Sequence, residues 1–124
     1  MIVGIHHAEI TIPRNCENRA RAFYCDFLGL SEIAKPRTMG RGGFWLQVGN
    51  RTVHVGIEDS ADRLGTRAHL AYEVTELDNW RRRVEEAGIA IEEPPLYPGH
   101  LRFKIRDPFG NQLEFIQRNG ASEL

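Results

Sequence analysis

The two halves of this chain carry the same order of short patterns, and this internal repeat limits the fold more than any other feature. The run IHHAEITIP near the start is matched by RAHLAYEV in the second half. RTVHVGI follows a Gly-Asn pair, and so does QLEFIQ near the end of the chain. A repeat of this length indicates one supersecondary unit that is used twice.

The first half shows the patterns of a strand, a helix and three further strands. Alternating residues over 4–12 predict a half-buried strand. A helix follows to about Leu28, with apolar residues on one stripe and Gly29 as its stop. The three further strand-like runs are SEIA, GGFWLQV and RTVHVGI, with a Gly-Asn turn between the last two.

The second half repeats this order. HLAYEV is its first predicted strand, and Thr75 with Asp78 resembles a capping box at the start of a helix that Gly88 ends. Its three further strands are IAIEE, LRFKIR and QLEFIQ. We therefore predict an α+β fold, a single domain of two βαβββ modules. The modules are 4–58 and 67–117, with a linker over 59–66 and a frayed tail over 118–124.

Composition places the chain among ordinary soluble proteins. It has 124 residues, of which 41% are hydrophobic and 27% charged, enough for one domain with its own core. The formal net charge of −1 creates no field that would attract nucleic acid or an anionic membrane. The N-terminus does not resemble a secretory signal, and Cys16 and Cys25 lie too far apart on one predicted helix to form a disulfide. These features predict a cytoplasmic protein.

Three imidazoles and one carboxylate occupy matching places in the two halves, at His7, His54, His69 and Glu114. In each strand, apolar residues at alternate positions lie on the other face, so each candidate lies opposite an apolar stripe. Such a set is typical of a divalent metal site, and two His with one carboxylate suit a metal that keeps open positions. The alternative is that each is an ordinary solvent-facing or hydrogen-bonded strand residue.

The chain resembles the vicinal oxygen chelate superfamily, which includes glyoxalase I, extradiol dioxygenases and bleomycin-resistance proteins. The resemblance covers residues 4–117, and its most specific motifs are HHAEITIP, ARAFYCDFLGL and DPFGNQLEF. It implies two modules whose curved mixed sheets form a half-barrel pocket with metal ligands on inward-facing strand positions. It also implies a homodimer, because small members often pair modules between chains.

His54 departs from the resembling pattern, since glyoxalase I-like enzymes have a ligating Glu at this position. Its imidazole can bind the metal, or it can remain free as a general base. Glu9 should share the face of His7 and can act as a base, orient an imidazole or pair with a cation. Both residues are therefore predicted catalytic candidates, and His54 is also a predicted ligand.

The same alternation predicts the residues that would face a substrate: Trp45, Gln47, Arg102 and Lys104. An aromatic wall beside cationic groups suits a flat or apolar molecule that carries an anion. The alternative is a solvated edge strand, where Lys and Arg are common.

The leading functional hypothesis is a metal-dependent lyase or isomerase of the glyoxalase type. Its small substrate would chelate the metal, which can be Fe, Mn, Ni, Co or Zn, through two neighbouring oxygens. Glu9 or His54 would then move a proton. One alternative is a single-domain extradiol-type dioxygenase that uses ferrous iron. The other is a metal-free protein that sequesters a ligand, as bleomycin-resistance proteins do.

Overall fold

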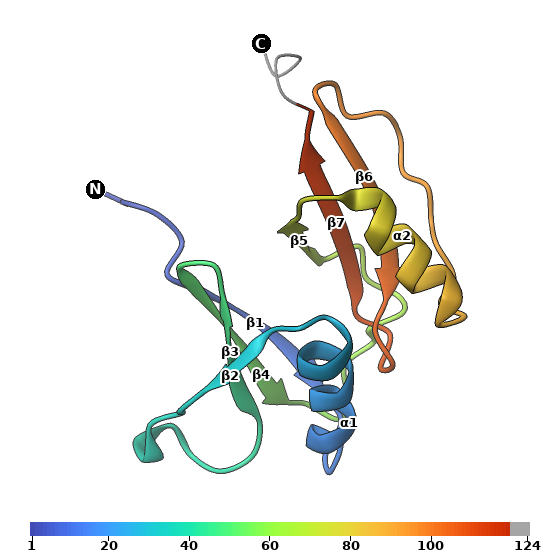
Figure 1. Cartoon of the computed structure of the whole chain (residues 1–124). Helices are drawn as coiled ribbons and strands as arrows, with labels where there is room; N and C mark the ends of the chain where they lie inside the picture. The colour runs from blue at the N-terminus through green and yellow to red at the C-terminus, as the bar shows by residue number, and fades with distance from the viewer. Residues whose placement is uncertain (120–124) are drawn as a thin grey trace. The chain divides into compact units, whose positions relative to one another are not determined.

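The computed structural model describes residues 1–119 and divides the chain into two compact units (Figure 1). Unit 1 comprises Met1–Asp62, and unit 2 begins at Arg63. Both units combine a mixed, open sheet with helices, so the predicted α+β fold is confirmed. The division falls inside the predicted linker.

Unit 1 contains one four-stranded sheet, one longer helix and one short 3₁₀ helix. Its elements are β1 (His7–Ile12), α1 (Glu17–Arg21), η1 (Ala22–Phe27), β2 (Ser31–Ile33), η2 (Arg37–Met39), β3 (Phe44–Val48) and β4 (Arg51–Ile57). The strand order is β1-β4-β3-β2, with β1 parallel to β4 and the other pairs antiparallel. The predicted first strand is shorter than expected, because the residues before His7 are exposed and belong to no strand.

The helix of unit 1 changes its geometry along its length. After α1 it becomes the π-helical segment η1, in which the Leu28 amide reaches back to the carbonyl of Phe23. The predicted stop at Gly29 is confirmed, since this residue adopts a φ of 82° and its amide bonds to Cys25. The wider turn still keeps Phe23 and Tyr24 in the core.

Unit 2 contains one helix and a three-stranded sheet. Its elements are β5 (His69–Glu73), α2 (Leu77–Glu86), β6 (His100–Arg106) and β7 (Gln112–Arg118), with the strand order β5-β7-β6. As in unit 1, the first strand is parallel to the last, and the other pair is antiparallel. The predicted strand IAIEE is wrong, since only Glu92 pairs with Lys104. Pro94 and Pro95, which cannot donate, follow at once and prevent further pairing.

The start of α2 also differs from the prediction. Its cap residue is Glu76 in a left-handed conformation, and neither Thr75 nor Asp78 supplies a side-chain cap. The first amide of the helix, that of Leu77, instead donates to the side-chain oxygen of Gln117 at 2.7 Å. A residue of β7 therefore caps the helix, and no local pattern could have indicated it.

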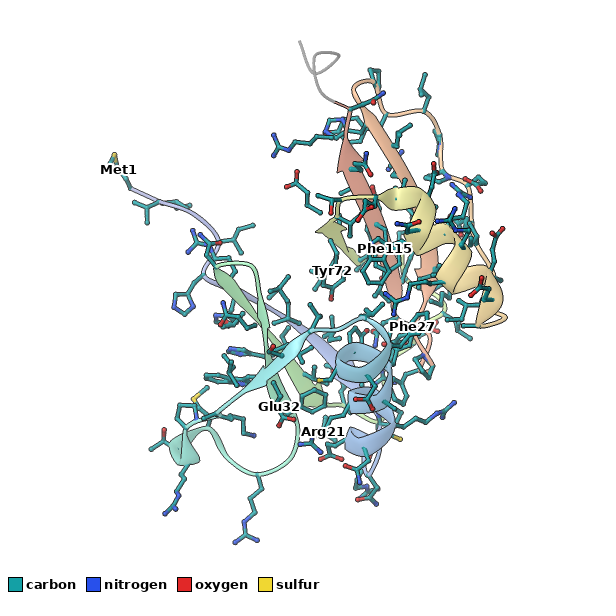
Figure 2. The ribbon with its side chains drawn as sticks, viewed as in Figure 1. Met1, Arg21, Phe27, Glu32, Tyr72 and Phe115 are labelled. Carbon is teal, nitrogen blue, oxygen red and sulfur yellow. The ribbon has the colours of Figure 1, made fainter. Side chains whose placement is uncertain are left out.

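The repeat extends to side-chain packing. In unit 1, Arg21 lies over the ring of Phe44 at 4.7 Å and pairs with Glu32 at 2.8 Å (Figure 2). In unit 2, Arg81 lies over the ring of Phe103 at 4.9 Å and pairs with Glu93. Each helix is thus joined to its sheet by one arginine that makes both a cation–π contact and an ion pair.

Each core forms where the apolar face of a sheet meets its helix. The buried hydrophobic residues of unit 1 include Ile12, Ala20, Phe23, Tyr24, Phe44, Leu46, Val53 and Val55. Those of unit 2 include Tyr72, Leu77, Val84, Phe103, Ile105, Leu113 and Phe115, of which Tyr72 and Phe115 are labelled in Figure 2. The tail is ordered further than predicted, because Arg118 completes β7 and the Asn119 amide bonds to Gly99. The rest of the predicted tail lies outside the described residues.

Candidate functional site

The candidate residues of unit 1 form a stack of rings on β1, β3 and β4. The ring of His54 lies between His7, at 4.1 Å between centroids, and Trp45, at 3.9 Å. His54 is only 8% exposed. Burial lowers its pKa, and the neighbouring His7 lowers it further. His54 is therefore neutral at pH 7 and keeps a lone pair for a metal or a proton.

Glu9 is the strand neighbour of His54 in the parallel pairing of β1 with β4. It is exposed, and its carboxylate lies against the backbone of Gly56, where an added Cβ would approach Oε2 at 2.9 Å. The same carboxylate acts on His54 and partly offsets the lowering of that pKa. A carboxylate next to a neutral imidazole can accept or relay a proton.

The candidate residues of unit 2 form an ionic network on β5, β6 and β7. His69 Nε2 lies 3.0 Å from Glu114 Oε1, and Arg102 Nη1 donates to Glu114 Oε2 at 3.2 Å. Glu114 is only 3% exposed. A buried carboxylate is tolerated only with such partners, so both oxygens of Glu114 are held in defined positions.

His69 is oriented by the backbone as well. Its Nδ1 lies 3.0 Å from the carbonyl oxygen of Arg67, which can only accept. The contact to this carbonyl fixes the orientation of the ring, so that Nε2 is directed at the Glu114 carboxylate. An imidazole nitrogen and a carboxylate oxygen at this distance attract each other only when a proton or a metal cation lies between them. Histidines that bind metals have this arrangement, with the second ring nitrogen donating to a carbonyl.

The four predicted ligands thus form two pairs, one in each unit. Within unit 1 the structure brings His7 and His54 together, and within unit 2 it brings His69 and Glu114 together. Among residues 1–119, no group of three or more His, Cys, Asp or Glu side chains is arranged to hold a metal. The donor types fit a divalent metal, and each unit contributes half of the predicted set.

Two of the predicted substrate-binding residues are engaged inside their own unit. The Gln47 side chain donates to the carbonyls of Gly49 and Arg51 in the turn between β3 and β4. Arg102 donates to Pro95 as well as to Glu114. Trp45 covers His54, and Lys104 is the strand neighbour of Glu114. Gln47 and Arg102 therefore stabilise the frame of the candidate site.

Unit 1 has a cavity of about 270 Å³ beside the stacked rings. It is lined by Glu9, Lys35, Met39, Arg41, Gly42, Trp45, His54, Val55, Gly56 and Ile57. Sequence reasoning missed Lys35 and Arg41, which belong to the irregular segment between β2 and β3. A signal was present, because residues 34–43 contain three basic side chains and no acidic one.

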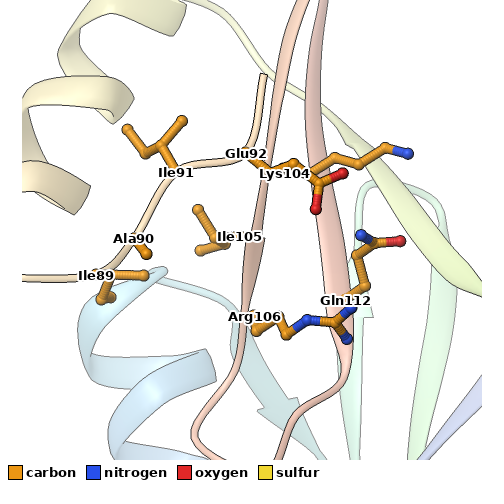
Figure 3. Close-up of a pocket in the computed structure, with 8 residues that line it drawn as sticks. All are labelled: Ile89, Ala90, Ile91, Glu92, Lys104, Ile105, Arg106 and Gln112. Carbon is orange, nitrogen blue, oxygen red and sulfur yellow. The ribbon is translucent and has the colours of Figure 1, made fainter. Parts of the chain in front are cut away.

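Unit 2 has a cavity of about 240 Å³ along the outer edge of β6 (Figure 3). One wall is apolar and consists of Ile89, Ala90, Ile91 and Ile105, while Glu92, Lys104, Arg106 and Gln112 are polar. The cavity lies beside residues 89–92, where the strand IAIEE was predicted. Ile105 and Lys104 are consecutive residues of β6, and consecutive side chains of a strand point to opposite faces. Both faces of the sheet therefore contribute to this cavity.

Comparisons with known proteins agree with this architecture. The model of the Glyoxalase/Bleomycin resistance protein/Dioxygenase superfamily matches residues 4–115, and the chain belongs to this family. The resemblance found in the sequence is thereby confirmed. No curated protein matches the chain.

Solved structures share the fold along almost the whole chain. A glyoxalase family protein from Bacillus anthracis is 37% identical, with a TM-score of 0.86 over 95% of this chain and 97% of that one. A lactoylglutathione lyase from Agrobacterium tumefaciens is 22% identical, with a TM-score of 0.70 over 92% of each chain. A fosfomycin resistance protein from Listeria monocytogenes, in complex with Mn(II) and sulfate, is 19% identical, with a TM-score of 0.78 over 100% and 97%. Within residues 1–119, no helix has both the length and the apolar character to cross a membrane.

Proposed function

We propose that this protein is a divalent-metal-dependent lyase or isomerase of the glyoxalase type. Its substrate is a small molecule that binds the metal through two neighbouring oxygens. The observation that carries this proposal is the environment of His69, whose Nδ1 is held by a backbone carbonyl while Nε2 faces the Glu114 carboxylate. The fosfomycin resistance relative, described with Mn(II), and the lactoylglutathione lyase share this fold.

The metal ligands in this proposal are His7, His54, His69 and Glu114, and the metal is Fe, Mn, Ni, Co or Zn. When bound, such an ion acts as a Lewis acid on the substrate oxygens and favours the developing negative charge. Arg102 keeps Glu114 in place through Oε2, and the carbonyl of Arg67 orients the ring of His69. Burial keeps the His54 ring neutral, as a ligand requires.

Glu9 is the proposed proton carrier. It is exposed to the cavity of unit 1 and is the strand neighbour of His54. A carboxylate in this place can take a proton from a carbon next to a carbonyl and return it elsewhere. If His54 is not a ligand, its neutral imidazole can carry the proton instead. Cys16 and Cys25 are both free, which supports the proposal of a cytoplasmic location.

Metal titration of the apo-protein tests this assignment. With Mn(II) or Zn(II) as the probe, calorimetry should show about one tightly bound ion for each pair of units. Glu114→Gln removes the anionic ligand but keeps its shape, and His69→Ala removes a ligand of the same unit. Each should weaken binding by more than about a hundredfold.

The matched control is Glu73→Gln, which neutralises an exposed carboxylate on β5 that pairs with Arg118. It should leave metal affinity unchanged. Wild-type affinity in the Glu114→Gln protein would exclude the proposed ligand set. Protein that binds no metal but retains a small ligand would instead favour the sequestering function.

We further propose that the protein is a homodimer in which the modules pair between chains. His7 and His54 of one subunit would then act with His69 and Glu114 of the other. After dissociation and reassociation, a mixture of His7→Ala and Glu114→Ala chains should regain one intact site per heterodimer. Light scattering that finds a monomer with full metal affinity at micromolar concentration would contradict this arrangement.

A further inference from the structure

The segment between β2 and β3 borders the cavity of unit 1 and is strongly basic. Lys35, Arg37 and Arg41 lie in it without any acidic residue. Lys35 and Arg41 line the cavity, whereas Arg37 does not. None of the three has an ion-pair partner within residues 1–119. Two unpaired cations therefore border a cavity next to the stacked His54 ring.

The backbone of this segment is anchored at its end. Gly43 has a φ of 74° and packs so closely on β4 that an added Cβ would lie 2.2 Å from the Val55 oxygen. Its amide donates to the Glu17 carboxylate of α1 at 3.1 Å. The Lys35 ammonium donates to the carbonyl of Gly42, which closes the segment on itself. The two cations are thus attached to a fixed backbone.

The charges around the cavity favour an anion. Glu9 is the single acidic residue among those that line it. The lining also includes the apolar side chains of Trp45, Val55 and Ile57. The cavity thus combines positive charge at one side with an aromatic and aliphatic wall.

The two arginines of β6 are already engaged in hydrogen bonds within unit 2. Arg102 is bound to Glu114 and Pro95, and Arg106 Nη1 donates to the carbonyls of Arg63 and Gly110. Neither Lys35 nor Arg41 pairs with a carboxylate within residues 1–119, and Lys35 donates to the carbonyl of Gly42 on its own segment. The segment before β3 therefore supplies two cations beside a cavity that the sequence prediction, which named Arg102 and Lys104, did not include.

We propose that Lys35 and Arg41 determine specificity by binding an oxyanion of the substrate, a carboxylate or a phosphonate, while its apolar part contacts Trp45. This inference rests on the proposed function, because it assigns the bound oxyanion to the substrate of that enzyme. Binding of the anion itself needs no metal. Arg41 can bind such a group with two parallel hydrogen bonds, and Lys35 adds a point charge.

The test uses the full chain without metal, in a buffer of low chloride content. The probes are lactate, its neutral amide lactamide, and hydroxymethylphosphonate. The readout is the indole N–H resonance of Trp45 in NMR titrations, which Trp45→Phe distinguishes from that of Trp80. Lactate or the phosphonate should shift this resonance with millimolar affinity, and lactamide should not. The anion that binds more tightly identifies the oxyanion class.

Charge removal completes the test. Lys35→Gln and Arg41→Gln should each weaken anion binding by about tenfold. Arg37→Gln removes the same charge from the same segment and should leave it unchanged. The proposal is overturned if lactamide binds as well as lactate, if Arg37→Gln has the same effect as Arg41→Gln, or if no probe shifts Trp45. Because the assay is metal-free, Glu114→Gln should bind the anion normally, so failure of the metal site gives a different result.

Discussion

The two units place different chemistry on the same backbone. His54 in β4 and Glu114 in β7 occupy equivalent positions, and each lies opposite a residue of the antiparallel neighbouring strand, Trp45 of β3 and Lys104 of β6 respectively. Both side chains are buried. The imidazole can be buried between two rings because it is uncharged. The carboxylate needs His69 and Arg102 at its oxygens. Burying a charge costs free energy, so the carboxylate of unit 2 requires hydrogen-bonding partners, whereas the imidazole of unit 1 requires only packing partners.

The helix starts show a second difference. In unit 2, Gln117 of β7 caps α2 through the amide of Leu77. The equivalent residue of unit 1 is Ile57 at the end of β4, which is 37% exposed, and α1 has no side-chain cap. The repeat therefore preserves the course of the chain and its apolar face, while polar contacts at the ends of elements have diverged.

Substituting glutamine at the two buried positions should give the largest contrast. Glu114→Gln should lower the free energy of unfolding of the metal-free protein by about 2 kcal/mol, because Arg102 loses its charged acceptor. His54→Gln should cost less than about 1 kcal/mol, since it loses only ring contacts. Urea unfolding measures both, with Glu73→Gln as an exposed control. Equal losses would mean that the charge of Glu114 is not stabilised by its partners.

Exchanging the residues at the ends of β4 and β7 should have a smaller effect. Gln117→Ile copies the residue of unit 1 into unit 2 and leaves the first amide of α2 without its acceptor. The expected cost is about 1 kcal/mol in thermal or urea unfolding. The reverse change, Ile57→Gln, lies at a partly exposed position and should cost almost nothing. If Gln117→Ile and Ile57→Gln lowered the free energy of unfolding equally, the hydrogen bond from Leu77 to Gln117 would contribute nothing beyond side-chain packing.

The pH dependence of stability should show the smallest effect. Burial holds the pKa of His54 below its ordinary value of 6.5. The unfolded chain therefore binds a proton more readily, and this part of the stability is present above pH 6.5 and lost as pH falls through the folded pKa. Unfolding of the metal-free protein at pH 7.5 and pH 5.5 measures it. His54→Gln should lose stability less steeply on acidification. An unchanged slope would show that His54 is not desolvated.

The sequence was informative where periodic patterns control structure. Alternation placed His7, His54, His69 and Glu114 on the faces opposite apolar stripes, and glycine stops after the helices were confirmed at Gly29 and Gly88, both with positive φ. Patterns were misleading at the start of α2, where the distant residue Gln117 provides the cap, and before Pro94 and Pro95, where a predicted strand does not form. The segment with Ile91 has strand-like composition, yet it forms a single bridge at Glu92.

The candidate site could be predicted less completely than the fold. The ring stack and the Glu114 network follow from strand pairing, which the repeat indicates. Lys35 and Arg41 lie in an irregular segment without periodicity, so their position beside the cavity could not be derived from alternation. The partners of Arg102 were also hidden, because the Pro95 carbonyl comes from a connecting loop.

The parallel pairing of first and last strands has a consequence for synthesis on the ribosome. In unit 1, β1 has its sheet neighbour in β4, so this sheet can close while the second half of the chain is still being made. In unit 2, β5 pairs with β7, and β7 also supplies the Gln117 cap of α2. A nascent chain that ends before β7 therefore lacks both the neighbour of β5 and the cap of α2. Unit 1 can thus complete its sheet during synthesis earlier than unit 2 can.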